Sequence, residues 1–165
     1  MKKTLLLISI PWILALSWCW SSKNIVEYND SFVAFVKECT DANQTLYQNF
    51  NTEWSTVDSI SETVQQNMTI CQTSKEKASK LWDYEKDGSL KDWVVDLLST
   101  EIEYLEKFWA TKRYRNINNI TDEDKLAYDS IVGELYQLEP ILNSKFVALQ
   151  EIQEAFAAKH GLKLQ

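Results

Sequence analysis

The sequence predicts an all-α protein: an elongated, antiparallel, up-down four-helix bundle that follows an N-terminal signal peptide. Apolar residues recur at steps of three and four along four long segments, which is the spacing of one helical face. No segment shows the two-residue alternation of a half-buried strand, and the chain has only 2 Pro. A positively charged start, a short apolar run and then polar residues form the pattern of a secretory leader.

The leader begins with Lys2 and Lys3 and continues as an apolar run from Thr4 to Leu16. This run of about 13 residues is shorter than the roughly 20 residues that a membrane-spanning helix needs. We therefore expect residues 1–18 to be a signal peptide that is removed. The alternative is an N-terminal membrane anchor that is retained.

The end of the leader resembles the lipobox of bacterial lipoproteins, which is an aliphatic residue, a small residue, Gly or Ala, and then Cys. Leu16, Ser17 and Cys19 match this motif, and Trp18 stands where it has Gly or Ala. The resemblance implies a lipoprotein-type signal peptide with a lipid on Cys19. It divides the chain into the leader, a lipidated tether of residues 19–24 and a helical bundle of residues 25–165.

Several Trp residues occupy positions where Gly would be usual. The chain has 7 Trp and only 3 Gly among 165 residues. Reading Trp18 and Trp20 as Gly would restore an ordinary lipobox and tether, and Trp54 and Trp82 both stand in expected turns. We hypothesise that several of these residues are UGA codons that the organism reads as Gly. The alternative is a Trp-rich protein with a degenerate lipobox, and UGG codons at positions 18 and 20 would end the hypothesis.

The charge balance excludes some partners. The formal net charge is −7 and the isoelectric point is near 4.8. A nucleic-acid-binding protein shows a basic face, and a polybasic membrane patch needs clustered cations. We therefore expect no nucleic acid as a partner, and contact with the membrane through the lipid anchor alone.

The first two helices are predicted over residues 25–50 and from residue 55 or 56 to about residue 81. The stripe of the first consists of Ile25, Tyr28, Phe32, Val36, Cys39, Asn43, Leu46 and Phe50. The stripe of the second is thinner and more polar, with Val57, Ile60, Val64, Asn67 or Met68, Cys71, Ala78 and Leu81. Ser55 followed by Asp58 resembles a capping box at the start of the second helix.

The third helix is predicted from Ser89, which caps it, to an end around residues 113–119. Its apolar face contains Leu90, Val94, Leu97, Leu98, Leu105 and Phe108, while Glu101, Glu103 and Glu106 point elsewhere. The fourth helix is predicted from a cap at Thr121 to Gly161. Pro140 lies inside it and removes one backbone donor, so we expect a kink near Leu138 or a split into two helices.

Cys39 and Cys71 are a candidate disulfide. In an antiparallel hairpin, residues equidistant from the turn face one another, and these two average to position 55, within a residue or two of the predicted turn. Disulfides persist in exported proteins. The alternative is two buried free thiols, because Cys is often a plain core residue.

Four features together resemble an uncharacterised family of helical bacterial surface lipoproteins. They are the lipobox-like end, the start of the first helix at Tyr28-Asn29, the helix start at 88–92 and the closing segment 156–162. The resemblance implies the same fold and location. These are packing and capping motifs, and the family carries no assigned activity, so the resemblance implies no chemistry.

The sequence argues against catalysis, metal binding and cofactors. Di-metal helical bundles need Glu-x-x-His pairs, and the single His, at position 160, has no Glu or Asp three or four residues before it. Glu101 and Glu134 could face inward, but without His they make a poor metal site. Gly-x-Ser-x-Gly and glycine-rich phosphate loops are absent from the sequence. We therefore expect no enzyme, no metal site and no cofactor.

Two functions remain as expectations. The first is a lipid-anchored surface or envelope protein that acts as a structural or protein-interaction module on the outer side of a bacterial membrane. The second is a small-ligand-binding module with a slot opened between helices by Pro140. A pocket beside residues 136–142, lined by Tyr136 and Phe146, would favour the second. A closed core with an exposed aromatic patch would favour the first, and two adjacent carboxylates in a polar cleft would favour an enzyme.

Overall fold

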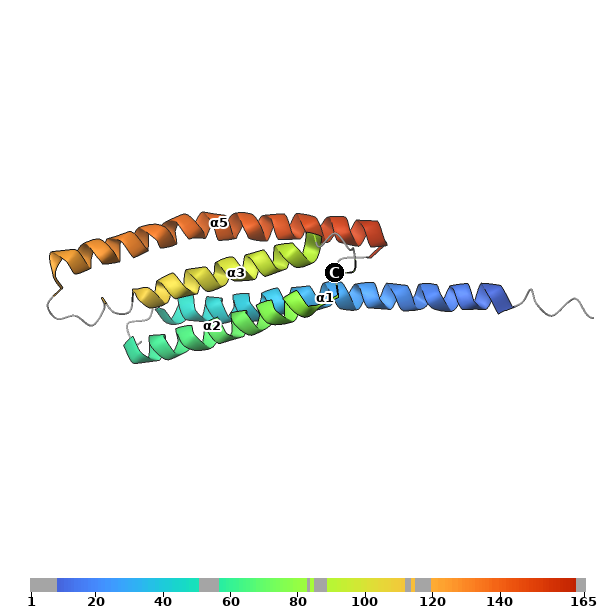
Figure 1. Cartoon of the computed structure of the whole chain (residues 1–165), viewed down its shortest axis with the longest axis horizontal. Helices are drawn as coiled ribbons and strands as arrows, with labels where there is room; N and C mark the ends of the chain where they lie inside the picture. Colours follow the sequence, from blue (N-terminus) through green and yellow to red (C-terminus); the bar gives the residue numbers. More distant parts are fainter. Residues whose placement is uncertain are drawn as a thin grey trace, which may run out of the picture.

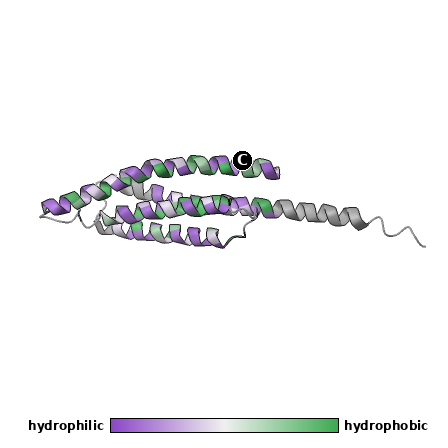
Figure 2. Cartoon of the chain, turned by 45° about the horizontal axis from the view of Figure 1, so that its top comes forward, coloured by the Kyte–Doolittle hydropathy of each residue, from purple (hydrophilic) through white to green (hydrophobic). Residues whose placement is uncertain are grey.

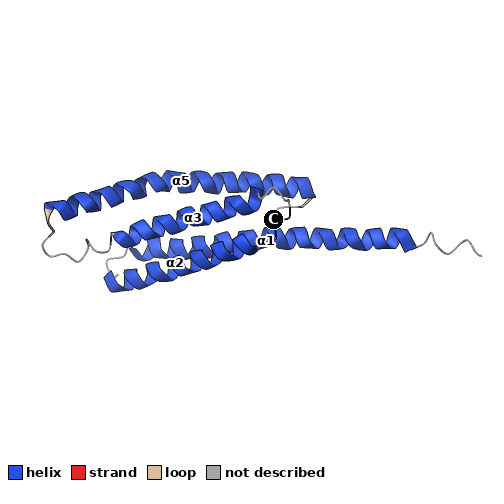
Figure 3. Ribbon diagram, in the orientation of Figure 1, coloured by secondary structure: helices blue, strands red, loops and turns tan. Residues whose placement is uncertain are grey.

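The described part of the chain forms four helices and contains no strand. The computed structural model describes residues 9–50, 57–82, 84, 89–111, 114 and 120–162, with side chains described for residues 24–44 and, within these ranges, from residue 61 onward. The helices are α1 (Ser9–Phe50), α2 (Val57–Lys80), α3 (Ser89–Ala110) and α5 (Asp122–His160). Successive helices run in opposite directions along one long axis (Figure 1), and Figure 3 shows the same elements by type. The predicted all-α, up-down four-helix bundle is confirmed.

Most predicted stripe residues whose side chains are described are buried in the core or packed against it. The buried core residues come from all four helices: Ile25, Tyr28, Phe32, Cys39, Val64, Cys71, Ala78, Leu90, Val94, Leu97, Leu98, Ile102, Leu105, Phe108, Leu149 and Phe156. Burying a large apolar side chain contributes about 1.5–3 kcal/mol, so these residues dominate the stability of the bundle.

The bundle is packed unevenly around its circumference. Helices that are consecutive along the chain pack closely, as α1 with α2, α2 with α3, and α3 with α5. Among the described residues, α1 and α5 touch at the fewest positions of any contacting pair, and α2 does not pack against α5. The seam between α1 and α5 is therefore the loosest part of the bundle.

Helix α5 is capped at both ends and continues through Pro140. The Thr121 hydroxyl accepts a hydrogen bond from the Asp124 backbone N–H (3.1 Å), and the Asp124 carboxylate accepts one from the Thr121 N–H (3.2 Å). Gly161 ends the helix in the left-handed conformation, with φ of 68°, which favours a residue without a Cβ. Pro140 does not split the helix, and Figures 1 and 2 show that α5 bends along its length.

Helix α1 begins earlier than the stripe predicted. It starts at Ser9, so residues 19–24 belong to the same helix as the core residues that follow. Figure 1 shows the first part of α1 projecting beyond the other helices. The predicted cap at Ser55 lies outside the described residues. None of the described helical stretches combines the length and hydropathy that crossing a bilayer requires.

Candidate functional site

A disulfide joins the first two helices at the middle of the bundle. Cys39 on α1 and Cys71 on α2 are bonded, with Cα atoms 4.7 Å apart and a sequence separation of 32 positions. Both side chains are fully buried. The two residues therefore lie opposite one another, as the hairpin geometry inferred from the sequence predicted. The bond links α1 covalently to α2.

A buried carboxyl group packs directly against this disulfide. Glu101 on α3 is only 3% exposed. Asn43 Nδ2 donates a hydrogen bond to its Oε2 (2.8 Å), and the Thr40 hydroxyl donates one to its Oε1 (3.3 Å). The prediction that Glu101 points away from the apolar face is wrong, whereas Glu103 and Glu106 are exposed as predicted.

The sequence contains the signal that would have placed Glu101 inside. Glu101 follows Leu97 by four residues and precedes Leu105 by four, so it continues the apolar stripe of α3. Residues four apart on a helix share a face. The residue type suggested a solvated position, but the spacing indicated a buried one, and the spacing prevailed.

Burial changes the acidity of Glu101. Desolvation raises the pKa of its carboxyl from 4.5 to about 7, and the hydrogen bonds from Thr40 and Asn43 oppose this rise without cancelling it. A carboxyl group taken out of water favours its neutral form when no cation compensates the charge. Glu101 is therefore poised to gain or lose a proton near neutral pH.

The contact with the disulfide does not compensate a charge on Glu101. Cys39 Sγ lies 2.6 Å from Glu101 Oε2. A sulfur in a disulfide has no hydrogen to donate, so it offers no hydrogen bond to an ionised carboxylate.

A cavity of about 430 Å³ opens above Glu101 at the α1–α5 seam. Its volume falls within the usual range for small-molecule sites. Its walls come from three helices: Thr40, Asn43 and Gln44 of α1, Glu101 and Tyr104 of α3, and Glu139, Leu142, Asn143 and Phe146 of α5. The lining thus combines two carboxyls, a phenol and several amides with two apolar side chains.

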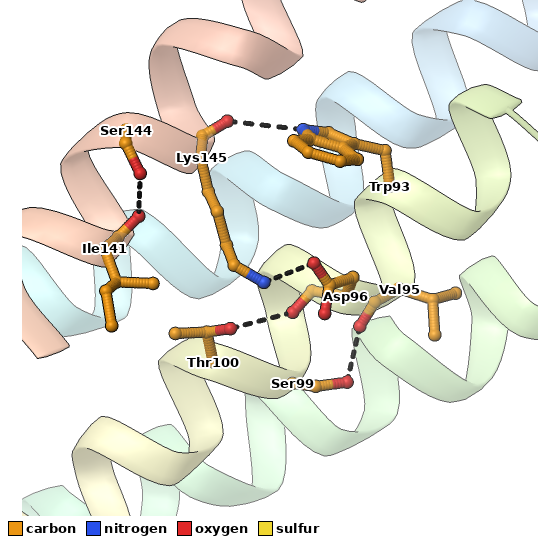
Figure 4. A network of polar contacts seen from close by, with 8 residues as sticks. All are labelled: Trp93, Val95, Asp96, Ser99, Thr100, Ile141, Ser144 and Lys145. Carbon is orange, nitrogen blue, oxygen red and sulfur yellow. Dashed lines mark hydrogen bonds and ion pairs between the residues drawn. The ribbon is translucent and has the colours of Figure 1, made fainter.

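Polar contacts between α3 and α5 support the wall of this cavity. Figure 4 shows Lys145 reaching from α5 to pair with Asp96 on α3, while Trp93 Nε1 donates to the Lys145 carbonyl oxygen (3.4 Å). Lys145 directly precedes Phe146 on the wall. These contacts hold α5 on α3 and so fix one side of the cavity.

The remaining predicted site residues are not brought into this cavity. Cys19 lies within α1, but its side chain is outside the described residues. Glu134 pairs with Lys107 at the α3–α5 contact, and His160 packs its ring against Tyr84 and Phe156. Glu101 and Glu134 therefore do not form a shared inward-facing pair.

Three of the buried groups have the spacing of metal ligands. The ligand atoms of Cys39, Cys71 and Glu101 lie within 4.8 Å of one another. Zinc binds cysteine as the thiolate, and the disulfide leaves no thiolate on either sulfur. In its oxidised form this cluster offers one carboxyl group as a conventional ligand.

A larger cavity, of about 630 Å³, lies at the end of the bundle nearest the N-terminal part of α1. It is lined by Asn24, Glu27, Tyr28, Ser31, Leu81, Trp82 and Tyr84. Its carboxyl group, Glu27, is exposed, so this cavity lacks the buried ionisable group of the smaller one. The smaller cavity therefore has the more distinctive chemistry.

The tryptophans differ in how they are held. Trp82 is 77% exposed, whereas Trp93 and Trp109 are partly buried against the core. The side chains of Trp12, Trp18, Trp20 and Trp54 lie outside the described residues. The UGA hypothesis stays a prediction, which the codons decide.

Comparison with known proteins does not extend this picture, because no family model, curated protein or solved structure matches the chain.

Proposed function

We propose that the protein is a lipid-anchored bacterial envelope protein whose bundle binds a small molecule in the cavity between α1, α3 and α5. The observation that carries the proposal is the 430 Å³ cavity with mixed polar and apolar walls. It lies beside the α5 segment that contains Pro140, where the second of the two expectations from the sequence placed a slot. Tyr136, which was expected to line that slot, instead points to solvent and is 72% exposed.

Binding rather than catalysis is proposed because of the residues that line the cavity. They supply hydrogen bonds, charge and apolar contact, but not a nucleophile paired with a base within hydrogen-bonding reach. The single histidine of the chain, His160, lies at the C-terminal end of α5. We likewise propose no metal or cofactor for the binding reaction.

The anchor proposal rests on the lipobox resemblance at Cys19. Because α1 is continuous, Cys19 lies six residues before Ile25, the first core residue among the described side chains. At 1.5 Å per residue this is about 9 Å along the helix axis. A lipid at Cys19 would therefore hold the bundle close to the outer surface of the membrane.

The anchor is tested by labelling cells with a palmitate analogue. The wild-type protein should incorporate the label, and the Cys19→Ala variant should not. An unlabelled wild-type protein, or one that retains residues 1–18, would contradict the anchor without affecting the binding proposal.

Binding is tested by blocking the cavity. Asn143→Trp places an indole on the cavity wall, and Val147→Trp places one on a neighbouring position of α5 that is 61% exposed and outside the cavity. A panel of small cationic, neutral and anionic amphiphiles is screened by the shift in melting temperature. We expect the ligands of the wild-type protein to be lost in Asn143→Trp and retained in Val147→Trp. Equal shifts in both variants would contradict the cavity as the binding site.

A protein-interaction role is the second candidate. Tyr136 and Val147 are eleven residues apart, which puts them on the same face of α5, and both are exposed. Aromatic residues are enriched in protein interfaces. In envelope cross-linking experiments, a partner that is captured by the wild-type protein and lost with Tyr136→Ser plus Val147→Ser would support this role. A partner retained by that variant would count against it.

A further inference from the structure

Glu101 differs from the other acidic residues at the helix contacts because no lysine pairs with it. Glu38 lies 3.6 Å from Lys77, Asp96 pairs with Lys145, and Glu134 pairs with Lys107. Glu101 is the most buried of these acids, yet its described contacts are with neutral donors and a sulfur atom.

Burying a carboxylate without a cation is costly, so such groups either stay neutral or acquire a partner. The positions around Glu101 leave room for that partner only on the cavity side. From α1, neutral Thr40 and Asn43 face it; from α2, the bonded sulfur of Cys71 lies beneath it. Tyr104 of α3 and Glu139 of α5 complete the titratable groups on the cavity wall.

Among the described residues, no lysine, arginine or histidine lines this cavity. The nearest basic residue along α5 is Lys145, which is engaged with Asp96. The cavity therefore has two carboxyl groups and no cation of its own. Leu142 and Phe146 add an apolar surface beside them.

We propose that the ligand of this cavity is an organic ammonium ion, whose charged nitrogen pairs with Glu101 and whose hydrocarbon part packs on Leu142 and Phe146. The inference rests on the proposed function and names its ligand class. The ammonium ion supplies the positive charge that the cavity wall lacks, and the Glu139 carboxylate adds a second electrostatic attraction at the mouth of the cavity. Amide and hydroxyl groups of Asn43, Asn143 and Thr40 remain to accept its other N–H bonds.

Binding changes the protonation of Glu101. Near pH 7 the carboxyl is partly protonated, and a cation in the cavity favours the ionised form. Each binding event therefore transfers a fraction of a proton from Glu101 to solvent. A ligand without positive charge does not favour the ionised form of Glu101, so its binding should release no proton.

The experiment compares three probes of matched shape: benzylammonium, benzyl alcohol and benzoate. Full-length protein with its disulfide intact, in a non-ionic detergent, is titrated calorimetrically near pH 7 in two buffers that differ in protonation enthalpy. We expect benzylammonium to bind at least tenfold more tightly than benzyl alcohol and benzoate, with net proton release. Glu101→Gln should lose at least tenfold in benzylammonium affinity, and the exposed Glu139→Gln should lose severalfold.

Glu103→Gln is the matched control, because Glu103 is an exposed acid two residues along the same helix. It makes the same Glu→Gln substitution outside the cavity and should leave the affinity unchanged. If benzyl alcohol or benzoate binds the wild-type protein as tightly, or Glu101→Gln binds benzylammonium normally, the ammonium inference is overturned and the cavity remains a binding site. If only neutral or anionic members of the wider panel bind, the ammonium inference fails alone. If nothing in that panel binds, the proposed function fails with it.

Discussion

Glu101→Gln should make the protein more stable at neutral and alkaline pH. In the folded state the pKa of Glu101 is about 7, while its ordinary value is 4.5. The folded state therefore binds the proton more tightly than the unfolded state. The stabilisation of the folded state by this bound proton is complete below about pH 4.5. It declines as the pH rises from 4.5 toward 7 and is lost above that window.

The magnitude follows from the difference between the two pKa values. Each unit of pKa corresponds to about 1.36 kcal/mol, so ionised Glu101 costs the folded state about 3 kcal/mol at high pH. Between about pH 5.5 and pH 8, the wild-type free energy of unfolding should fall by about 2 kcal/mol through this group alone. Gln keeps the shape and can still accept hydrogen bonds, but it carries no charge, so this decline should vanish.

The assay is urea unfolding of the non-reduced protein without ligand, at several values between about pH 5.5 and pH 8. Glu103→Gln serves as the control because it makes the same substitution at an exposed site. We expect the Glu101→Gln profile to be flatter than the wild-type profile by about 2 kcal/mol across this window. Parallel profiles for wild type and Glu101→Gln would refute the reasoning that burial raises the pKa of this carboxyl.

Three further predictions concern stability. Replacing Cys39 and Cys71 together by Ser should lower the free energy of unfolding by about 3–4 kcal/mol, because the bond joins residues 32 positions apart. Equal urea midpoints for the variant and the non-reduced wild type would argue against this. Thr121→Ala should cost about 1 kcal/mol through loss of the capping box, with the loss seen as faster amide exchange in the first turn of α5. Phe32→Ala should cost about 3–5 kcal/mol by emptying a fully buried ring site, and a melting temperature equal to wild type would contradict the core placement.

The local sequence determined the helices and their order. Residue spacing of three and four indicated four helices, and Thr121 and Gly161 marked the ends of the last helix where the structure has them. These features depend on residues within one or two helical turns, so they can be read without knowledge of the fold. The start of α1 at Ser9 was missed, because the expected boundary followed the change from leader to mature chain rather than helical continuity.

The sequence predicted the pairing of Cys39 with Cys71 in part. Hairpin symmetry placed the two residues opposite one another, and that geometry is realised. Symmetry alone could not decide between a bond and two thiols, because the choice depends on the distance between two packed helices.

Only the tertiary structure decided the candidate site. Whether Glu101 is buried depends on α1 and α5 closing over α3, and whether it has a counter-ion depends on where Lys77, Lys107 and Lys145 reach. The cavity exists because α1 and α5 pack less closely than the other neighbouring helices. These properties depend on contacts between side chains that are tens of residues apart in the chain. The spacing of residues within a single helix therefore does not predict them.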